Sequence, residues 1–302
     1  MTRWLATLCL VVITLPGLAR AQDRQFLGWG RLFDNDAIGD TQDRWNTGSY
    51  TISVLKGPEW SGTLPQHFGD ILEYRLSART IAPADLVAPD ASDRRYVGAL
   101  SFGLHTHAEW QGFEASLGAD LVLTGPQTGI GRFQTWVHHV FGLPKPDLSN
   151  QLGNAVHPTL TAELGRSIAL GNTVTVRPFV AAEAGVETYL RVGGDLVIGS
   201  FGQGALMLRD EVTGQRFRGI TSDRTPALSF TLGGDVARVF SSAYLPTGGA
   251  AVASDTRTRL RAGLQWQGQS ASVFYGVTYL APEFKSQPQG QIVGSLNVNL
   301  RF

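Results

Sequence analysis

The sequence predicts an all-β protein, a transmembrane antiparallel β-barrel of about twelve strands with a short helix near its extracellular mouth. Strict alternation of apolar and polar residues recurs along most of the chain. Residues 295–302 alternate in the same way and end in a terminal Phe, which is usual for the closing strand of an outer-membrane barrel. The last strand of a soluble sandwich would show the same alternation. The segment that begins the chain favours the outer-membrane barrel over this alternative.

Residues 1–21 have the features of a secretory signal peptide. A basic start at Arg3 precedes an apolar run from Trp4 to Leu15, and the segment ends in an Ala-x-Ala site. The run is too short to cross a bilayer as a helix. We therefore expect removal of residues 1–21 and a single barrel domain over residues 22–302. Cys9 lies in the leader, so the mature chain would offer no disulfide and no thiol nucleophile.

Charged residues lie on the polar parity of the predicted strands. Glu73 and Arg75 alternate with leucine and tyrosine, and Arg259 and Arg261 alternate with apolar neighbours. Arg or Lys on the lipid face costs roughly 2–4 kcal/mol at the midplane, so these side chains are expected to face the lumen. A mature chain of about 280 residues allows roughly ten to fourteen strands, an even number in bacterial barrels. We place loops or turns at 57–68, 80–94 and 199–224.

The segment 126–157 predicts a short amphipathic helix. Phe133, Trp136, Val137, Val140 and Phe141 are spaced three and four apart. Such a helix would lie over the barrel mouth or in its wall near the membrane surface.

Two residues of this helix are polar and share another face. Gln134 and His138 are four residues apart, so they project together and mostly away from the apolar anchors. An imidazole titrates near neutrality, so His138 is a candidate general base. A packed or surface histidine is the alternative interpretation. His105 and His107 share a strand face and could ligate a metal, but no third ligand has convincing spacing, so a lumenal polar pair is the preferred interpretation.

Residues 34–48 gather oxygen-bearing side chains around one tight connection. Asn35 and Asp36 end one apolar stretch, and an Asp43-Arg44-x-x-Thr47 run opens the next. Oxygen ligands of this kind suit Ca²⁺ or a polar head group. By alternation Thr47 falls on the lumenal parity. The 25 basic and 25 acidic residues balance, so no basic excess indicates a nucleic-acid partner.

Three motifs give the chain a resemblance to a known family. The first is Asn35-Asp36 with the Asp-Arg-x-x-Thr run, and the second is Asp93-Arg94-Arg95-Tyr96. The third runs from Gly125-Pro126 through Gly131, Gln134, His138 and Gly142 to a downstream Gln-Leu-x-Asn. Together they resemble the LpxR family, the outer-membrane lipid A 3′-O-deacylases. Departures include Asn46, Ser49, Arg95 and Val97, and no lysine lies between Lys56 and Lys145.

The resemblance implies a calcium-dependent barrel of twelve strands that removes the 3′-linked acyloxyacyl group of lipid A. By motif, the active-site residues would be His138, Asn35, Asp36 and Thr47, with Asp36 and Asn35 near Ca²⁺. His138 would act as general base on a water, and the ion would stabilise the oxyanion.

The remaining expectations concern substrate and surroundings. Candidate contacts to the substrate are Arg44, Arg94, Arg132 and Gln134. The expected partners are lipopolysaccharide and other lipids of the bacterial outer membrane, and the expected state is a monomer. Two alternatives stay open: an outer-membrane phospholipase barrel and a non-catalytic barrel.

Overall fold

The computed structural model of the chain describes residues 24–220 and 226–300. The predicted signal peptide at 1–21 and the terminal Phe302 lie outside these residues. Among the described residues no helix is long and apolar enough to cross a membrane.

The described residues form mainly strands, with three short helical segments. The strands are β1 Gln25–Asn35, β2 Trp45–Gly57, β3 Ile71–Ala82, β4 Val97–Trp110, β5 Phe113–Thr124, β6 Ala155–Gly165, β7 Ile168–Leu170, β8 Val174–Ala184, β9 Glu187–Ile198, β10 Leu206–Arg209, β11 Arg216–Ile220, β12 Ala227–Ser242, β13 Thr256–Gln267, β14 Ala271–Leu280 and β15 Gln291–Leu300. The helices are the 3₁₀ turns η2 Asp36–Ile38 and η3 Pro126–Thr128 and the α-helix α2 Ile130–Phe141.

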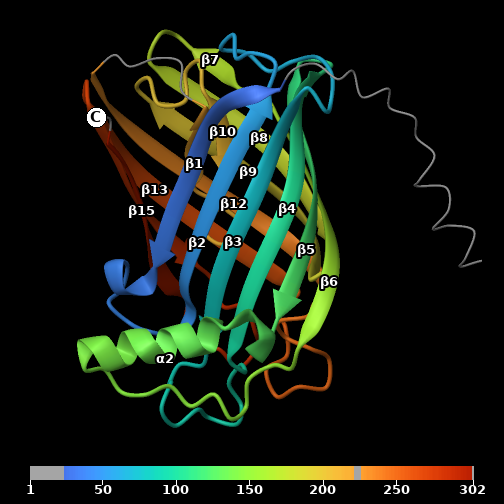
Figure 1. Cartoon of the computed structure of the whole chain (residues 1–302), viewed down its shortest axis with the longest axis vertical. Helices are drawn as coiled ribbons and strands as arrows, with labels where there is room; N and C mark the ends of the chain where they lie inside the picture. Colours follow the sequence, from blue (N-terminus) through green and yellow to red (C-terminus); the bar gives the residue numbers. More distant parts are fainter. Residues whose placement is uncertain (1–23, 221–225, 301–302) are drawn as a thin grey trace, which may run out of the picture.

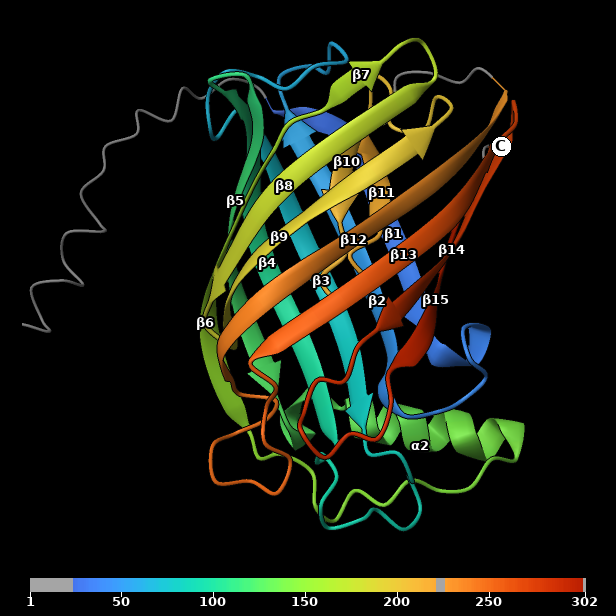
Figure 2. The ribbon, with the colours of Figure 1, turned by 180° about the vertical axis from the view of Figure 1, so that it is seen from behind.

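Within the described part of the chain, twelve strands close into an antiparallel barrel (Figures 1 and 2). Strands that follow one another in the barrel wall pair with each other, and β1 pairs with β15. On the opposite side β6 pairs with β8 from Leu160↔Ala184 to Gly165↔Phe179, which closes the ring. The short β7 pairs with the far part of the same β8, so it continues the β6 edge. The predicted barrel of about twelve strands is confirmed.

The outer face of the barrel is apolar. On β3, β4 and β13 the exposed positions include Tyr74, Leu76, Phe102, Leu260 and Leu264. Their neighbours in sequence point inward and are polar. Apolar side chains on the outside and charges on the inside are the arrangement of a barrel that spans a membrane.

The inward-facing charges pair with one another across the lumen. Asp235 accepts hydrogen bonds from Arg191, Arg259 and Arg261, with Arg259 Nε 2.9 Å from its Oδ1. Glu73 pairs with Arg75 in the same way at 2.8 Å. The predicted lumenal placement of Glu73, Arg75, Arg259 and Arg261 is therefore confirmed, and each charge has an opposite partner in place of water.

The sequence predicts loops or turns over 199–224, but within this range residues 206–220 form the β10–β11 hairpin, which lies inside the barrel (Figure 2). Leu208 and Phe217 pack in a buried cluster with Leu32, Leu55 and Phe274 of the wall. Strands of four and five residues give too short an alternation to detect, and an isolated hairpin is unstable without such support. The other predicted loops connect strands, with β3 extending to Ala82.

The two ends of the barrel differ. The first and last described residues of the wall, on β1 and β15, lie at one end, and α2 lies at the other, across the outside of the neighbouring strands (Figure 1). The long connection 125–154 is at the α2 end, whereas the tight turns at 111–112 and 268–270 are at the opposite end. Long loops are extracellular and short turns periplasmic in such barrels, so α2 is at the extracellular mouth, as predicted.

The lumenal ion pairs predict a large difference between two aspartates. Asp235→Ala is expected to destabilise the barrel by about 3–5 kcal/mol, because Arg191 and Arg259 lose their buried counter-charge and Arg261 keeps only Asp195. Asp255→Ala is the matched control, because Asp255 pairs with Arg238 at 3.5 Å on the surface and should contribute about 0–1 kcal/mol. Reversible urea unfolding in lipid vesicles measures both values. Equal losses for the two variants would contradict the structural role of the Asp235 network.

Candidate active site between helix α2 and the barrel wall

A groove of about 870 Å³ lies between α2 and the outer face of β1, β2 and β3. Asn35, Asp36, Thr47, Gln134 and His138 all line it, although they are up to a hundred residues apart in the chain. The rest of the lining is largely apolar and comprises Phe33, Ala37, Tyr50, Ala78, Leu86, Val87, Ile130, Phe133, Val137 and Leu143 among others. The predicted catalytic residues thus converge, and they do so outside the barrel lumen.

Glycines set both ends of α2. Gly129 precedes the helix with φ 73°, and Gly142 ends it with φ 67°, a left-handed conformation that glycine adopts without strain. The amides of Gly142 and Leu143 then donate to the last carbonyls of the helix, including that of His138. Pro144 follows and cannot continue the helix. This ending places the Pro144 carbonyl next to the last helical turn.

Helix α2 has its polar face toward the protein and its apolar face outward. His138 and Gln134 are 6% and 8% exposed, whereas Phe133, Trp136 and Phe141 are 60%, 59% and 74% exposed. A helix on a soluble protein has the opposite arrangement. The outward apolar face is continuous with the lipid-facing belt of the barrel, which indicates that α2 rests in the membrane interface.

The connection between β1 and β2 is held in an unusual backbone conformation. Asn35 caps η2 by accepting from the Ala37 amide at 2.8 Å. Thr41 and Trp45 have φ values of 62° and 51°, which are rare for residues with a side chain. Burial of Trp45 with Leu245 and Phe284 holds this conformation in place. Outliers of this kind concentrate at functional sites, where surrounding packing maintains them.

Thr47 faces the groove because of a β-bulge, and the lumenal placement expected from alternation is wrong. The register of β2 against β3 shifts between Asn46 and Gly48, which leaves Thr47 as the extra residue. Asn46 points inward, where its Nδ2 donates to Glu283, while Thr47 turns outward to the groove. A bulge re-aims one side chain without disturbing the alternation on either side of it, so period-two analysis does not detect it.

Four groups, Thr47, Asp43, His138 and Pro144, form a chain of polar contacts across the groove. Thr47 Oγ1 donates to Asp43 Oδ1 at 3.1 Å, and Asp43 Oδ2 lies 3.1 Å from His138 Nε2. His138 Nδ1 lies 2.6 Å from the Pro144 carbonyl oxygen. Because a carbonyl only accepts, Nδ1 carries a hydrogen, and Nε2 is the nitrogen that faces the groove.

Asp43 is the residue that sequence reasoning missed. It is not among the site residues predicted from the sequence, yet it joins His138 to Thr47. Its position in the Asp-Arg-x-x-Thr run, four residues before Thr47, is a signal that could have identified it.

Asp36 is a buried carboxylate with few partners. Its Oδ2 accepts from the Arg44 amide at 2.7 Å, and no side-chain cation pairs with it among the described residues. Burial raises the pKa of Asp36 to about 8, and the nearby charges of Asp43 and Asp40 add to the increase. A carboxylate in this environment, beside the oxygens of Asn35 and Thr47, is a donor set that suits a hard cation such as Ca²⁺.

The lumenal histidines are paired, which agrees with the preferred interpretation. His105 Nε2 lies 3.1 Å from Asp120, and His107 Nε2 lies 2.7 Å from Glu73. Over residues 24–220 and 226–300, no three histidine, aspartate, glutamate or cysteine side chains gather in a metal-binding cluster. A calcium site would therefore draw also on amide, hydroxyl or backbone oxygens.

The three arginines expected to contact substrate lie in different places. Arg94 is buried at the inner side of the mouth and donates to Glu283 at 2.6 Å. Although burial favours the neutral acid, Arg257 and Arg94 hold the pKa of Glu283 at about 2. Arg44 pairs with Asp40 and stacks on Trp45, and Arg132 is exposed on α2. None of the three lines the groove, in contrast to Gln134, whose buried Oε1 has no hydrogen-bond partner.

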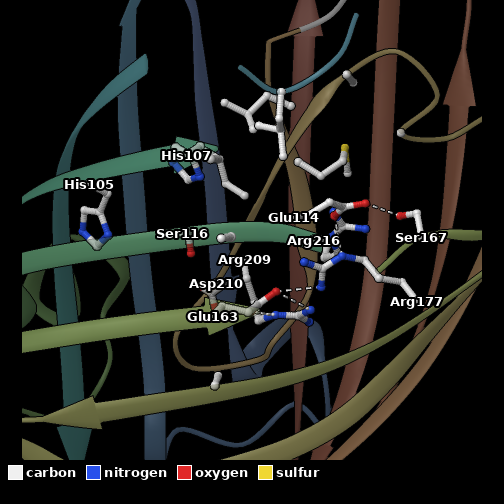
Figure 3. Close-up of a pocket in the computed structure, with 18 of the residues that line it drawn as sticks. His105, His107, Glu114, Ser116, Glu163, Ser167, Arg177, Arg209, Asp210 and Arg216 are labelled. Atoms are coloured by element: carbon white, nitrogen blue, oxygen red, sulfur yellow. Dashed lines mark hydrogen bonds and ion pairs between the residues drawn. The ribbon is translucent and has the colours of Figure 1, made fainter. Parts of the chain in front are cut away.

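A second cavity, of about 450 Å³, lies inside the barrel beside the β10–β11 hairpin (Figure 3). Several of its charged side chains are paired. Arg177 pairs with Glu114 and Glu163, and Arg209 of the hairpin also pairs with Glu163. None of the predicted catalytic residues lines this cavity.

Comparisons with known proteins agree with this geometry. The family model described as "Outer membrane protein LpxR" matches residues 5–302. Among solved structures, LpxR from Salmonella typhimurium superposes with a TM-score of 0.74 at 17% identity, covering 91% of this chain and 100% of that one. The β domain of the Bordetella autotransporter BrkA gives a TM-score of 0.44 at 12% identity, with 92% and 99% covered. No curated protein matches. The fold is that of an outer-membrane barrel, and the predicted outer-membrane location is confirmed.

Placement of α2 in the interface predicts a lipid contact for one tryptophan. In vesicles that contain brominated lipids, Trp136→Phe is expected to remove part of the quenchable tryptophan fluorescence, because Trp136 is exposed on the outward face of α2. Trp45→Phe is the control, since Trp45 is buried in the protein and should not report on lipid. An unchanged quenchable fraction in Trp136→Phe would place α2 in water.

Proposed function

This chain belongs to the LpxR family of outer-membrane proteins, and we propose that it is a lipid A 3′-O-deacylase that hydrolyses the 3′-linked acyloxyacyl ester. One observation carries the proposal. His138 is oriented by a hydrogen bond to the Pro144 carbonyl and an ion-pair contact with Asp43, in a groove that lies on the outside of the barrel and is lined largely by apolar side chains. A base in that position can reach an ester whose acyl chains remain in the membrane, and it cannot reach a solute inside the lumen.

His138 has the features of a general base. Its Nδ1 hydrogen is held by the Pro144 carbonyl, which fixes the ring and leaves Nε2 to accept a proton. Nε2 takes the proton of a water molecule while the water oxygen attacks the ester carbonyl carbon. The same nitrogen then returns the proton to the sugar oxygen as the acyl carbon–oxygen bond breaks. The products are a free acid and the sugar hydroxyl.

Asn35 is placed to stabilise the negative charge that develops on the ester oxygen. Its Oδ1 is occupied by the Ala37 amide, whereas its Nδ2 has no acceptor among the described residues and lies beside Gly48. A Cβ at position 48 would be 3.0 Å from that nitrogen, so the glycine keeps the approach open. A fixed amide donor of this kind acts as part of an oxyanion hole.

Asp36 and Asn35 are the residues that would hold Ca²⁺, in agreement with the oxygen donors around the buried Asp36 carboxylate. When bound, the ion would stabilise negative charge on the ester oxygen. The ion would also balance the charge of Asp36, which has no other cationic partner among the described residues.

The apolar part of the groove would receive the acyl chain. Phe33, Tyr50 and Ala78 form its floor on β1, β2 and β3, and Val137 of α2 faces them. Gln134 has a buried amide with no partner for its oxygen, so it would hydrogen-bond a polar group of the substrate. Among the predicted arginines, Arg132 is exposed on α2 and would meet a phosphate of the head group.

Two alternatives differ in substrate or in chemistry. A phospholipase barrel would use the same groove and the same base on a glycerol ester. A non-catalytic, conducting barrel is disfavoured by the hairpin and the paired charges that fill the lumen.

The main test is the lipid A of cells that express the protein. Mass spectrometry is expected to show loss of the 3′ acyloxyacyl group. His138→Ala should reduce the rate by about 10²–10⁴-fold, since the general base is lost. His139→Ala should retain activity, because the neighbouring side chain is exposed outside the groove. Calcium chelation should also suppress hydrolysis.

Unchanged lipid A with a correctly folded wild-type barrel would contradict the proposal. Release of fatty acids from phospholipids, with lipid A unchanged, would instead support the phospholipase alternative.

The groove floor predicts a residue that controls acyl-chain access. Ala78→Trp is expected to raise KM for long-chain substrates about tenfold or more, because the indole would fill space that the chain needs. Leu76→Trp is the matched control on the same face of β3, two residues away and outside the groove. Steady-state kinetics in detergent micelles separates the two, and equal KM values would show that the chain lies elsewhere.

A further inference from the structure

We propose that Asp43 is a positioning residue that binds the protonated imidazole of His138 and so stabilises the charge that the ring gains during hydrolysis. This inference rests on the hydrolysis proposed above, and it assigns a role to a residue that the catalytic set of His138, Asn35, Asp36 and Thr47 does not contain.

Both carboxylate oxygens of Asp43 contact residues of the site. Oδ1 accepts from the Thr47 hydroxyl and Oδ2 faces His138 Nε2, each at 3.1 Å. The carboxylate is fixed from two sides, although Asp43 lies on a connection between strands.

Other aspartates in the loops of this end behave differently. Asp36 accepts from the Arg44 amide, Asp40 from the Gln42 amide, and Asp85 from the Val87 amide. These carboxylates stabilise turns by binding backbone N–H groups. Asp43 accepts no backbone hydrogen bond in the described structure, so turn formation does not account for its side chain.

The position of the hydrogens on the imidazole decides whether the contact between His138 and Asp43 is favourable. Nδ1 donates to the Pro144 carbonyl, so a neutral His138 would present a bare lone pair at Nε2. A lone pair and a carboxylate oxygen repel each other. The 3.1 Å contact becomes favourable when Nε2 carries a proton and the pair is an imidazolium and a carboxylate. The observed arrangement therefore matches the state in which His138 has taken a proton from water.

Several other ionisable groups surround the imidazole. The connection between β1 and β2 contributes Asp36, Asp40 and Arg44, the loop before β4 contributes Tyr96 and Asp85, and α2 contributes His139. Arg44 is engaged by Asp40 at 3.1 Å. Among the described residues, Asp43 is the carboxylate within ion-pair distance of His138. Removal of its charge should therefore dominate any change in the behaviour of the base.

The catalytic cycle places Asp43 after the proton transfer. As the water oxygen bonds to the acyl carbon, its proton moves to Nε2 and the ring becomes a cation. Asp43 stabilises that cation until the proton passes to the departing sugar oxygen.

The test compares Asp43→Asn, Asp43→Glu and Asp40→Asn in a micellar assay of lipid A hydrolysis from pH 5 to 9. Asp43→Asn is expected to lower kcat roughly tenfold or more and to move the acidic limb of the pH–rate profile to lower pH, because the charged ring loses the carboxylate beside it. Asp43→Glu should restore much of the rate and the profile. Asp40→Asn keeps the Asp43 contact and should leave the profile in place.

A spectroscopic experiment tests the contact between Asp43 and His138 without substrate. In protein labelled with ¹⁵N-histidine at mildly acidic pH, the Nε2-bound proton of His138 should resonate at low field and disappear in Asp43→Asn. His138→Gln assigns the signal. The proposal is overturned if Asp43→Asn keeps the wild-type rate and profile, or if the rate falls equally at every pH with the low-field proton retained. A wild-type protein that hydrolyses no lipid A would refute the proposed function instead, while the spectroscopic result would still decide whether Asp43 binds the ring.

Discussion

The pairing of buried charges inside the barrel is the interaction on which the rest of the structure depends. Asp235 and Asp195 each bind two or more arginines from different strands, and Arg209 of the internal hairpin joins the same network. Removal of Asp235 would leave Arg191 and Arg259 without a buried counter-charge in a water-poor interior. The network fixes strands that have only apolar lipid-facing contacts on their other side. Together with the β10–β11 hairpin it occupies much of the lumen, and the catalytic candidates lie outside it.

A lumen largely occupied by the hairpin and paired charges is consistent with a reaction site on the outer wall of the barrel. Helix α2 turns its polar face to that wall and leaves Phe133, Trp136 and Phe141 outward, which would be costly in water and is favourable in lipid. This orientation of α2 encloses His138 and Gln134 between protein surfaces. It also keeps the groove next to the acyl-chain region of the membrane. A lipid substrate can then enter from the side without leaving the membrane.

The sequence predicted the barrel, the helix and the convergence of His138 with Asn35 and Asp36, because each depends on a regular period or on a motif. The features that the sequence did not predict are single departures from a regular pattern. The bulge at Thr47 changes one side chain's direction while the strand pattern continues. The β10–β11 hairpin is too short to show a period, and its stability comes from the wall around it. The Arg94 ion pair joins residues 189 positions apart, a pairing that no local pattern encodes.

The position of the site at the barrel seam links catalysis to closure of the fold. Strands β1 and β15 register through three residue pairs in the described structure, from Phe33↔Leu296 to Asn35↔Gly294. Beyond these pairs, η2 and the residues next to it contact β14 and β15. The Asp40 amide donates to the Ile292 carbonyl, and the Tyr275 hydroxyl donates to that of Ile38. Gly39 packs so closely on β15 that a Cβ would lie 2.2 Å from the Ile292 oxygen. The connection that orients Asn35, Asp36 and Asp43 therefore gains its shape only when the first and last strands meet. An unclosed barrel would lack the groove, so the proposed ester-hydrolysing site and the membrane-inserted fold form together.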